Sequence, residues 1–329
     1  MRKRPLSKGM KRINNLYSSI ISIDNLTLAS NNAKKGKLHQ RSVQEFLKNP
    51  NHNIEQLHLL LKSNTFHTSE YSTFVIHEPK ERVISRLPFY PDRIVHHAIL
   101  NILEPIFVKH FVIDTYSCIK KRGIHLALNN LRKALKNTTE TTYCLKLDIT
   151  KFYPSINHQI LKQQLQRKFK DAQLLNLLFE IIDSAPGVPI GNYLSQYFAN
   201  FYLSPFDRWL KQDKRVKYYF RYADDIVILS NDKAYLHSLL SEIKNFLDVK
   251  LKLHVKENYQ VFPVAARGID FVGYKTFHTH TLIRKRIKKA FARKLKTHPN
   301  NLSIASYKGW CKHANTKNLL KKLLPNEKV

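Results

Sequence analysis

Residues 221–225, Arg-Tyr-Ala-Asp-Asp, constrain the fold most, because two adjacent carboxylates stand between two apolar arms. The arms are Lys217–Phe220 and Ile226–Leu229, whose aromatic and β-branched residues are typical of strands. The segment therefore predicts a strand, a tight turn and a second strand. Asp is also common in ordinary hairpin tips. The pair alone leaves two interpretations open, a solvated turn or a turn that presents acidic oxygens to divalent metal ions.

The net charge points to a polyanionic partner. The chain of 329 residues has 56 Lys and Arg against 24 Asp and Glu, a formal charge of +32. The basic residues recur along the chain, and 18 Phe and 16 Tyr lie among them, as stacking on bases requires. A groove that binds nucleic acid is therefore favoured over a basic membrane-surface protein, since no amphipathic basic helix adjoins an apolar anchor.

Cysteine and hydropathy patterns exclude several classes of protein. Cys118, Cys144 and Cys311 form no Cys-x-x-Cys pair, which argues against a zinc finger or a disulfide framework. No run of about 18 apolar residues occurs, and no apolar segment follows the basic N-terminus. We therefore expect a soluble protein of the bacterial cytoplasm with no membrane partner.

A third carboxylate, Asp148, ends the predicted strand at Tyr143–Ile149. Metal-assisted phosphoryl transfer needs two or three acidic oxygens that converge from different elements, because Mg²⁺ prefers octahedral oxygen ligation and keeps substrate phosphates as ligands. A strand-end aspartate beside a hairpin with two aspartates meets this requirement.

Periodicity predicts helices near Asn14–Ile23, at Pro91–His110 and at Arg284–Lys296. The last is amphipathic and basic, which fits a solvated face or, with the charge of the whole chain, contact with a phosphate backbone. The cations expected to make this contact are Arg284, Lys285, Arg286, Lys288, Lys289, Arg293 and Lys294.

Several segments, in this order, resemble the motifs of reverse transcriptases. They are Asp148-x4-Tyr153, Gly187–Gln196, Tyr222–Asp225 and Gly268–Tyr274, preceded by Glu78–Ser85 and Asp92–Val95, which resemble the fingers motifs. The resemblance extends over about residues 71–317.

The resemblance implies a metal site. Asp148 and Asp224 would ligate two Mg²⁺ ions, for which Mn²⁺ can substitute, with Asp225 in support and the Ile149 carbonyl completing one coordination sphere. Lys256 stands where many polymerases have a proton donor, although a surface lysine is the alternative.

The resemblance also implies a nucleotide pocket and a primer grip. The ring of Tyr153 would collide with a 2′-hydroxyl and so select deoxynucleotides, although an ordinary packing role is the alternative. The residues implied in dNTP binding are Lys80, Arg82, Tyr153, Ile190, Gly191, Ser195 and Gln196, and those of the primer grip are Phe271, Gly273 and Tyr274, where Gly273 also fits a β-bulge.

One motif indicates the type of polymerase. The pattern Ile190-Gly191-x3-Ser195-Gln196 resembles that of reverse transcriptases from bacterial and phage diversity-generating retroelements. These enzymes belong to the group II intron-like superfamily of reverse transcriptases. Relatives of that type copy a template-repeat RNA with errors at adenines, and the cDNA replaces a variable repeat by mutagenic retrohoming. Ile190 stands where accurate relatives have an amide side chain. An aliphatic side chain cannot make the amide's hydrogen bond, and its loss weakens discrimination against wrong nucleotides by roughly 1–3 kcal/mol. Relaxed fidelity is therefore a hypothesis.

Two alternatives stay open. One is a group II intron or retron-type reverse transcriptase, and the other is a catalytically inactive RNA-binding cofactor, against which the intact aspartates argue. The implied partners are template RNA, the cDNA/RNA hybrid, dNTPs and a small basic helical accessory variability protein, pentameric in relatives.

The expected fold is an α+β right-hand polymerase, with a palm of a small antiparallel sheet plus helices, fingers and a short basic helical thumb. The expected domains are a basic N-terminal extension (1–50), fingers and palm (51–281) and a thumb (282–329). The fingers would comprise about 51–147 and 158–187, and the palm the remainder of 51–281.

Overall fold

The structure, a computed structural model, describes residues 12–77, 81–297 and 300–324. These residues form two compact units. The first comprises the described parts of 1–111, 151–205 and 251–253, and the second those of 112–150, 206–250 and 254–329. None of the helices in these described ranges is long and apolar enough to cross a membrane.

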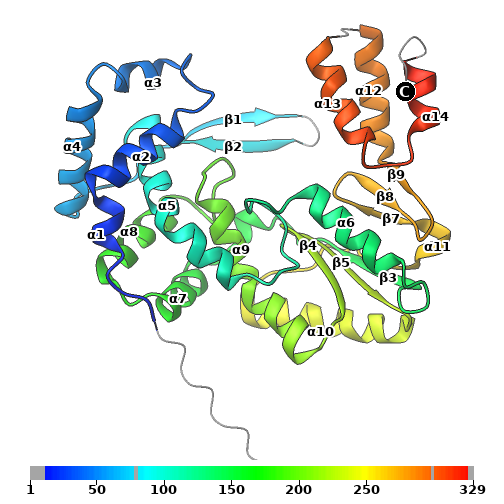
Figure 1. Cartoon of the computed structure of the whole chain (residues 1–329). Helices are drawn as coiled ribbons and strands as arrows, with labels where there is room; N and C mark the ends of the chain where they lie inside the picture. Colours follow the sequence, from blue (N-terminus) through cyan, green and yellow to red (C-terminus); the bar gives the residue numbers. More distant parts are fainter. Residues whose placement is uncertain (1–11, 78–80, 298–299, 325–329) are drawn as a thin grey trace, which may run out of the picture. The chain divides into compact units, whose positions relative to one another are not determined.

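Helices form the N-terminal part of the first unit (Figure 1). They are α1 (Tyr17–Ile21), α2 (Ile23–Ala33), α3 (Arg41–Phe46) and α4 (Pro50–Lys62). The helix expected near Asn14–Ile23 is present as the shorter α1. It ends at Ile21 because the hydroxyl of Ser22 accepts a hydrogen bond from Asn25 N (3.3 Å) and starts a new helix. The Asn25 amide also donates to the carbonyl of Ala98 (3.0 Å). The described part of the expected N-terminal extension is thus packed into the first unit.

The rest of the first unit contains a two-stranded antiparallel sheet and further helices. The elements are β1 (Ser72–Ile76), β2 (Arg82–Arg86), a kinked turn (Phe89–Arg93) in which Tyr90 is extended, α5 (Ile94–His110), a 3₁₀ turn (Tyr153–Ser155), α7 (His158–Lys168), α8 (Ala172–Asp183) and most of α9 (Ser195–Arg208). The helix expected at Pro91–His110 is confirmed in α5, which begins after the kinked turn.

A four-stranded antiparallel sheet in the order β4-β5-β3-β6 forms the centre of the second unit. Its strands are β3 (Tyr143–Leu147), β4 (Tyr218–Tyr222), β5 (Asp225–Ser230) and β6 (Gln260–Pro263). Tyr222 pairs with Asp225, so the predicted hairpin is confirmed with a turn of only two residues, Ala223 and Asp224. Leu147 pairs with Ile226, and the next step of this register brings Asp148 beside the same turn.

Helix α6 (Ile124–Leu135) covers one face of this sheet, and α10 (Lys233–Leu251) runs along the other (Figure 1). A π-helical turn (Trp209–Asp213) follows α9. The core under α6 contains Leu128, Val227 and Phe262, together with Phe271 and Phe291 from the C-terminal elements. Burial of these large apolar side chains stabilises the unit at about 25 cal/mol per Å².

The C-terminal part of the second unit has a small sheet and three helices. The elements are α11 (Val264–Arg267), β7 (Ile269–Phe271), β8 (Tyr274–Thr276), β9 (Thr281–Ile283), α12 (Lys285–Thr297), α13 (Asn301–Cys311) and α14 (Lys317–Leu323). The basic helix expected at Arg284–Lys296 is confirmed in α12. The segment expected to be a helical thumb begins with strand residues Leu282 and Ile283, which pair with β8. The domain boundaries given above remain predictions.

Candidate active site at the aspartate turn

The turn between β4 and β5 holds Asp224 at its tip and Asp225 at the start of β5. Ala223, not an aspartate, adopts the left-handed conformation, with φ of +55°. A non-glycine residue in this region costs roughly 1 kcal/mol. The surrounding structure must therefore hold the turn in this geometry.

Asp148 completes the cluster. It follows β3, and its carboxyl group lies beside that of Asp224. Burial, and then the neighbouring Asp148 carboxylate, raises the pKa of Asp224 to about 7. Burial also raises the pKa of Asp225 to about 6, against the opposite effect of Lys146. Carboxylates this close repel one another when ionised, so the cluster favours a bound proton or a bound cation.

Two lysines flank the cluster. Lys146 Nζ lies 3.3 Å from Asp225 Oδ1, and it also donates to the main-chain carbonyl of Asp270. Lys256 Nζ lies 3.7 Å from Asp148 Oδ2, and the main-chain N–H of Lys256 donates to the Asp148 carbonyl (2.8 Å). The sequence placed Lys256 near the reaction, and the structure brings it to the cluster. Sequence reasoning missed Lys146, although its position two residues before the strand-end aspartate was a usable signal.

The donor set fits divalent cations. Among the described residues, no group of three or more His, Cys, Asp or Glu side chains is already arranged to hold a metal ion. The three aspartates nevertheless offer hard oxygen donors. Among the described residues, buried Asp225 Oδ1 accepts no hydrogen bond and has only the ion pair with Lys146 Nζ at 3.3 Å beside it. A divalent cation would take the place of the proton that the raised pKa of Asp224 favours. Ile149 follows Asp148 and pairs with Val255 in an antiparallel bridge, which fixes the main chain there.

The residues implied in nucleotide binding lie in the first unit. The Val188 N–H donates to the Tyr153 carbonyl (3.0 Å), and the Ser85 N–H donates to the Ile190 carbonyl (2.8 Å). Gly191 has φ of +122°, and a Cβ there would lie 2.2 Å from the Ser85 carbonyl oxygen. The loop before α9 is therefore docked on β2.

The other described members of this set lie on β2 and α9. Arg82 lies on the exposed strand β2, Ser195 is buried at the start of α9, and Gln196 beside it is exposed. Lys80 lies outside the described residues. The structure thus places Arg82, Tyr153, Ile190 and their neighbours in one unit, and the aspartates in the other.

The expected primer grip surrounds the turn between β7 and β8. Phe271 and Tyr274 are both 0% exposed, so these residues belong to the core and offer no surface to a primer. Gly273 has φ of +90°, and a Cβ there would lie 2.4 Å from the Trp310 ring. Gly273 is therefore a turn residue that packing requires, and not a bulge.

Helix α12 buries Phe291 and exposes most of its cations. Arg284, just before the helix, forms an ion pair with Asp270 (2.5 Å). Lys285, Arg286, Lys288, Lys289 and Arg293 are exposed, and Lys294 is half-buried. The helix therefore presents a positively charged surface suited to phosphates.

Comparison with known proteins gives the following similarities. A family model described as "Reverse transcriptase (RNA-dependent DNA polymerase)" matches residues 76–276. Protein YkfC of Escherichia coli (strain K12) is 26% identical over 258 residues, 65% of this chain and 66% of that protein. The retron Ec73 reverse transcriptase of Escherichia coli is 23% identical over 266 residues, 71% of this chain and 81% of that protein. The group II intron-encoded protein LtrA of Lactococcus lactis subsp. cremoris is 22% identical over 174 residues, 49% of this chain and 28% of that protein.

Solved structures of telomerase share the fold. The chain from Candida albicans, in complex with a fragment of telomeric RNA, has a TM-score of 0.51 and 12% identity, over 82% of this chain and 58% of that one. Apo telomerase from Candida tropicalis has a TM-score of 0.50 and 16% identity, over 70% of this chain and 52% of that one. The predicted α+β polymerase fold is confirmed. The chain spans less than two thirds of the length of YkfC, LtrA and the telomerase chains.

Proposed function

Because the chain belongs to the reverse transcriptase family, we propose that it is an RNA-directed DNA polymerase that transfers nucleotides from dNTPs to a primer 3′-hydroxyl on an RNA template. The observation that carries this proposal is the cluster of Asp148, Asp224 and Asp225, held at one end of the central sheet. Carboxylates that converge from two elements are what nucleotidyl transfer requires.

Asp148 and Asp224 would hold two divalent ions, Mg²⁺ or Mn²⁺, with Asp225 in support. When bound, these ions would supply Lewis acidity and neutralise charge on the reacting phosphates. Lys146 partly balances Asp225 and keeps it oriented. Lys256 Nζ, which lies 3.7 Å from Asp148 Oδ2, would give a proton to the leaving pyrophosphate.

In the first unit, Arg82 and Lys80 would pair with the triphosphate. The half-buried Tyr153 would exclude a 2′-hydroxyl, and its carbonyl is fixed by the Val188 N–H. Gly191, Ser195 and Gln196 would line the same pocket. The cations of α12 and Arg284 would contact the backbone of the template RNA or of the cDNA/RNA hybrid.

Primer extension tests the activity. With an RNA template, a DNA primer, dNTPs and Mg²⁺, the wild-type chain should extend the primer and Asp224→Ala should not. Asp248→Ala removes an exposed carboxylate of α10 and serves as the matched control, which should retain extension. Extension that does not depend on Asp224 would refute the proposal. An inactive RNA-binding cofactor would bind the template and extend nothing.

For the type of polymerase, we propose an error-prone enzyme of a diversity-generating retroelement, which copies a template-repeat RNA for mutagenic retrohoming with a small basic accessory protein. Ile190 supports this, since an aliphatic side chain cannot make the polar check of an amide. Similarity to LtrA and to the retron enzyme supports the alternative, a group II intron or retron-type enzyme.

Fidelity separates these two types. Misincorporation opposite template adenine should be several-fold lower in Ile190→Gln than in the wild type, because the amide restores a discriminating hydrogen bond. Template uridine serves as the internal control. Equal error rates in both proteins would mean that Ile190 does not determine the fidelity.

A further inference from the structure

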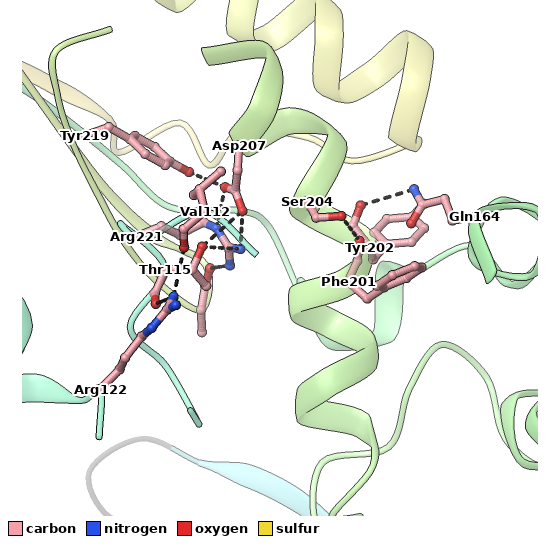
Figure 2. A network of polar contacts seen from close by, with 11 residues as sticks. Val112, Thr115, Arg122, Gln164, Phe201, Tyr202, Ser204, Asp207, Tyr219 and Arg221 are labelled. Atoms are coloured by element: carbon pink, nitrogen blue, oxygen red, sulfur yellow. Dashed lines mark hydrogen bonds and ion pairs between the residues drawn. The ribbon is translucent and has the colours of Figure 1, made fainter. Parts of the chain in front are cut away.

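Figure 2 shows a buried ion pair between Arg221 and Asp207. Arg221 and Asp207 are both 0% exposed. Arg221 donates from Nε to Asp207 Oδ1 (2.7 Å) and from Nη2 to Asp207 Oδ2 (2.6 Å). Tyr219 and Thr115 donate their hydroxyls to the same carboxylate at 2.5 and 3.2 Å. Asp207 thus holds the guanidinium in one orientation.

The remaining arm of the guanidinium reaches the turn. Arg221 Nη1 donates to the main-chain carbonyl of Ala223 (2.9 Å). Ala223 is the residue at φ of +55°, and its carbonyl belongs to the peptide that precedes Asp224. A hydrogen bond to this oxygen fixes the peptide plane, and the plane fixes the direction in which the Asp224 side chain leaves the main chain.

The main chain of Arg221 is also fixed by hydrogen bonds. The Arg221 N–H donates to the Asp114 carbonyl, and the Tyr116 N–H donates to the Arg221 carbonyl, both at 3.0 Å. Arg122 holds this neighbouring segment through the carbonyls of Val112 (2.9 Å) and Thr115 (3.0 Å), as Figure 2 shows. The guanidinium therefore links the turn to a hydrogen-bonded segment of the same unit.

Stability alone does not account for this arrangement. Desolvation of two charges offsets most of their attraction, so an apolar pair of the same volume commonly holds a fold as well or better. An apolar side chain cannot donate a hydrogen bond to the Ala223 carbonyl. The feature that requires an arginine is thus the contact with the turn.

We propose that Arg221, oriented by Asp207, is a positioning residue that holds the Ala223 carbonyl and thereby sets the Asp224 carboxylate in the geometry needed to bind divalent cations and transfer nucleotides. The catalytic part of this inference rests on the proposed function, and the cation-binding part does not.

Arg221→Lys tests the contact with the turn. Lysine can keep the charge pair with Asp207 but lacks the second arm that reaches Ala223. We expect kcat for single-nucleotide incorporation to fall about 10- to 100-fold, with the KM for dNTP within about twofold, because only the geometry of the carboxylates changes. Mn²⁺ binding to the full chain, measured by electron paramagnetic resonance, should weaken several-fold.

Thr141→Val is the matched control for loss of stability. Its buried hydroxyl donates to the Asn137 carbonyl (2.7 Å) in the same unit and touches no residue of the turn. It should lower the melting temperature while kcat and Mn²⁺ binding stay unchanged. Wild-type Mn²⁺ binding in Arg221→Lys, or a loss of kcat no greater than the loss of folded protein, would overturn the inference.

A charge-free double variant keeps the test decisive if the lysine variant folds poorly. Arg221→Met combined with Asp207→Asn leaves no unpaired charge, and the amide oxygen still accepts from Tyr219. We expect a folded protein that binds Mn²⁺ weakly and has a kcat reduced at least as much as that of Arg221→Lys. Wild-type Mn²⁺ binding in this variant would overturn the inference. If wild-type protein binds Mn²⁺ but extends no primer, the proposed function is wrong. The Mn²⁺ binding of these variants then still tests the cation-binding part of the inference.

Discussion

Two hairpin turns of the second unit each hold a non-glycine residue at a positive φ, and they do so by different contacts. Each has two residues, and each begins with a non-glycine residue in the left-handed region, Ala223 at φ of +55° and Val272 at +45°. The turn at Ala223 is held by a hydrogen bond from a buried arginine, whereas the turn at Val272 is closed by packing of Gly273 against Trp310. A hydrogen bond from one side leaves the carboxylates open to ligands. Packing closes the other turn into the core.

Loss of a carboxylate should give the largest effect on the first turn. Asp224→Asn should lower kcat for nucleotide incorporation by about 10³-fold or more, roughly 4 kcal/mol, because a neutral amide is a poor ligand for a divalent cation. Single-turnover incorporation checks this, with Asp248→Asn as the control. A variant that keeps a tenth of the activity would mean that the aspartate turn is not the reaction site.

The second turn should respond through stability. Gly273→Ala should lower the free energy of unfolding by about 3 kcal/mol, since the new Cβ must enter the Trp310 ring space at an unfavourable φ. Gly309→Ala in α13 is the matched control, because its Cβ would meet nothing within 4 Å and alanine favours a helix by roughly 0.5–1 kcal/mol. Urea denaturation measures both. If Gly273→Ala is as stable as the wild type, packing does not support this turn.

In the first turn, loss of a carboxylate should lower activity but raise the stability of the fold. In the folded, metal-free protein burial and Asp148 raise the pKa of Asp224 to about 7, whereas its ordinary value is 3.8. Between about pH 4 and 7 the folded state keeps a proton that the unfolded state has lost, so stability falls as pH rises through this window. Asp224→Asn should not lose stability in this way, because the amide does not ionise. Its free energy of unfolding should equal that of the wild type at pH 4 and exceed it by roughly 1–2 kcal/mol at pH 8.

Denaturation in EDTA at several pH values measures this advantage. Added Mg²⁺ should stabilise the wild type and leave Asp224→Asn unchanged. A difference in stability that is the same at every pH would contradict the repulsion within the cluster.

Relief of strain in the first turn should have the smallest effect. Ala223→Gly relaxes the positive φ but adds freedom to the unfolded chain, and the two effects nearly cancel, within about 0.5 kcal/mol. We expect kcat to fall two- to fivefold, because only the Arg221 hydrogen bond then restrains the turn. Thermal melting and single-nucleotide incorporation check both values. A stability change above 1 kcal/mol would mean that the strain is not balanced as described.

Local pattern was enough to predict the elements of the site. The hairpin, the strand before Asp148 and helix α12 follow from alternation or helical periodicity in short windows, and the structure confirms all three. The break at Ser22 was missed because a helix cap and a mid-helix serine look alike until the main-chain geometry is known. The burial of Phe271 and Tyr274 was missed because alternation does not tell which face of a small sheet is covered.

The sequence by itself determined the family and was enough to suggest the proposed chemistry, since motif order and three aspartates do not depend on distant contacts. Only the tertiary structure gave Arg221 a role, although it stands beside the aspartates in the same motif. Its partner Asp207 lies 14 residues away on α9, and a charged residue between aromatic ones reads as solvent-facing in a sequence. Burial, which the packing of α9 and the sheet decides, converts that charge into a fixed hydrogen-bond donor.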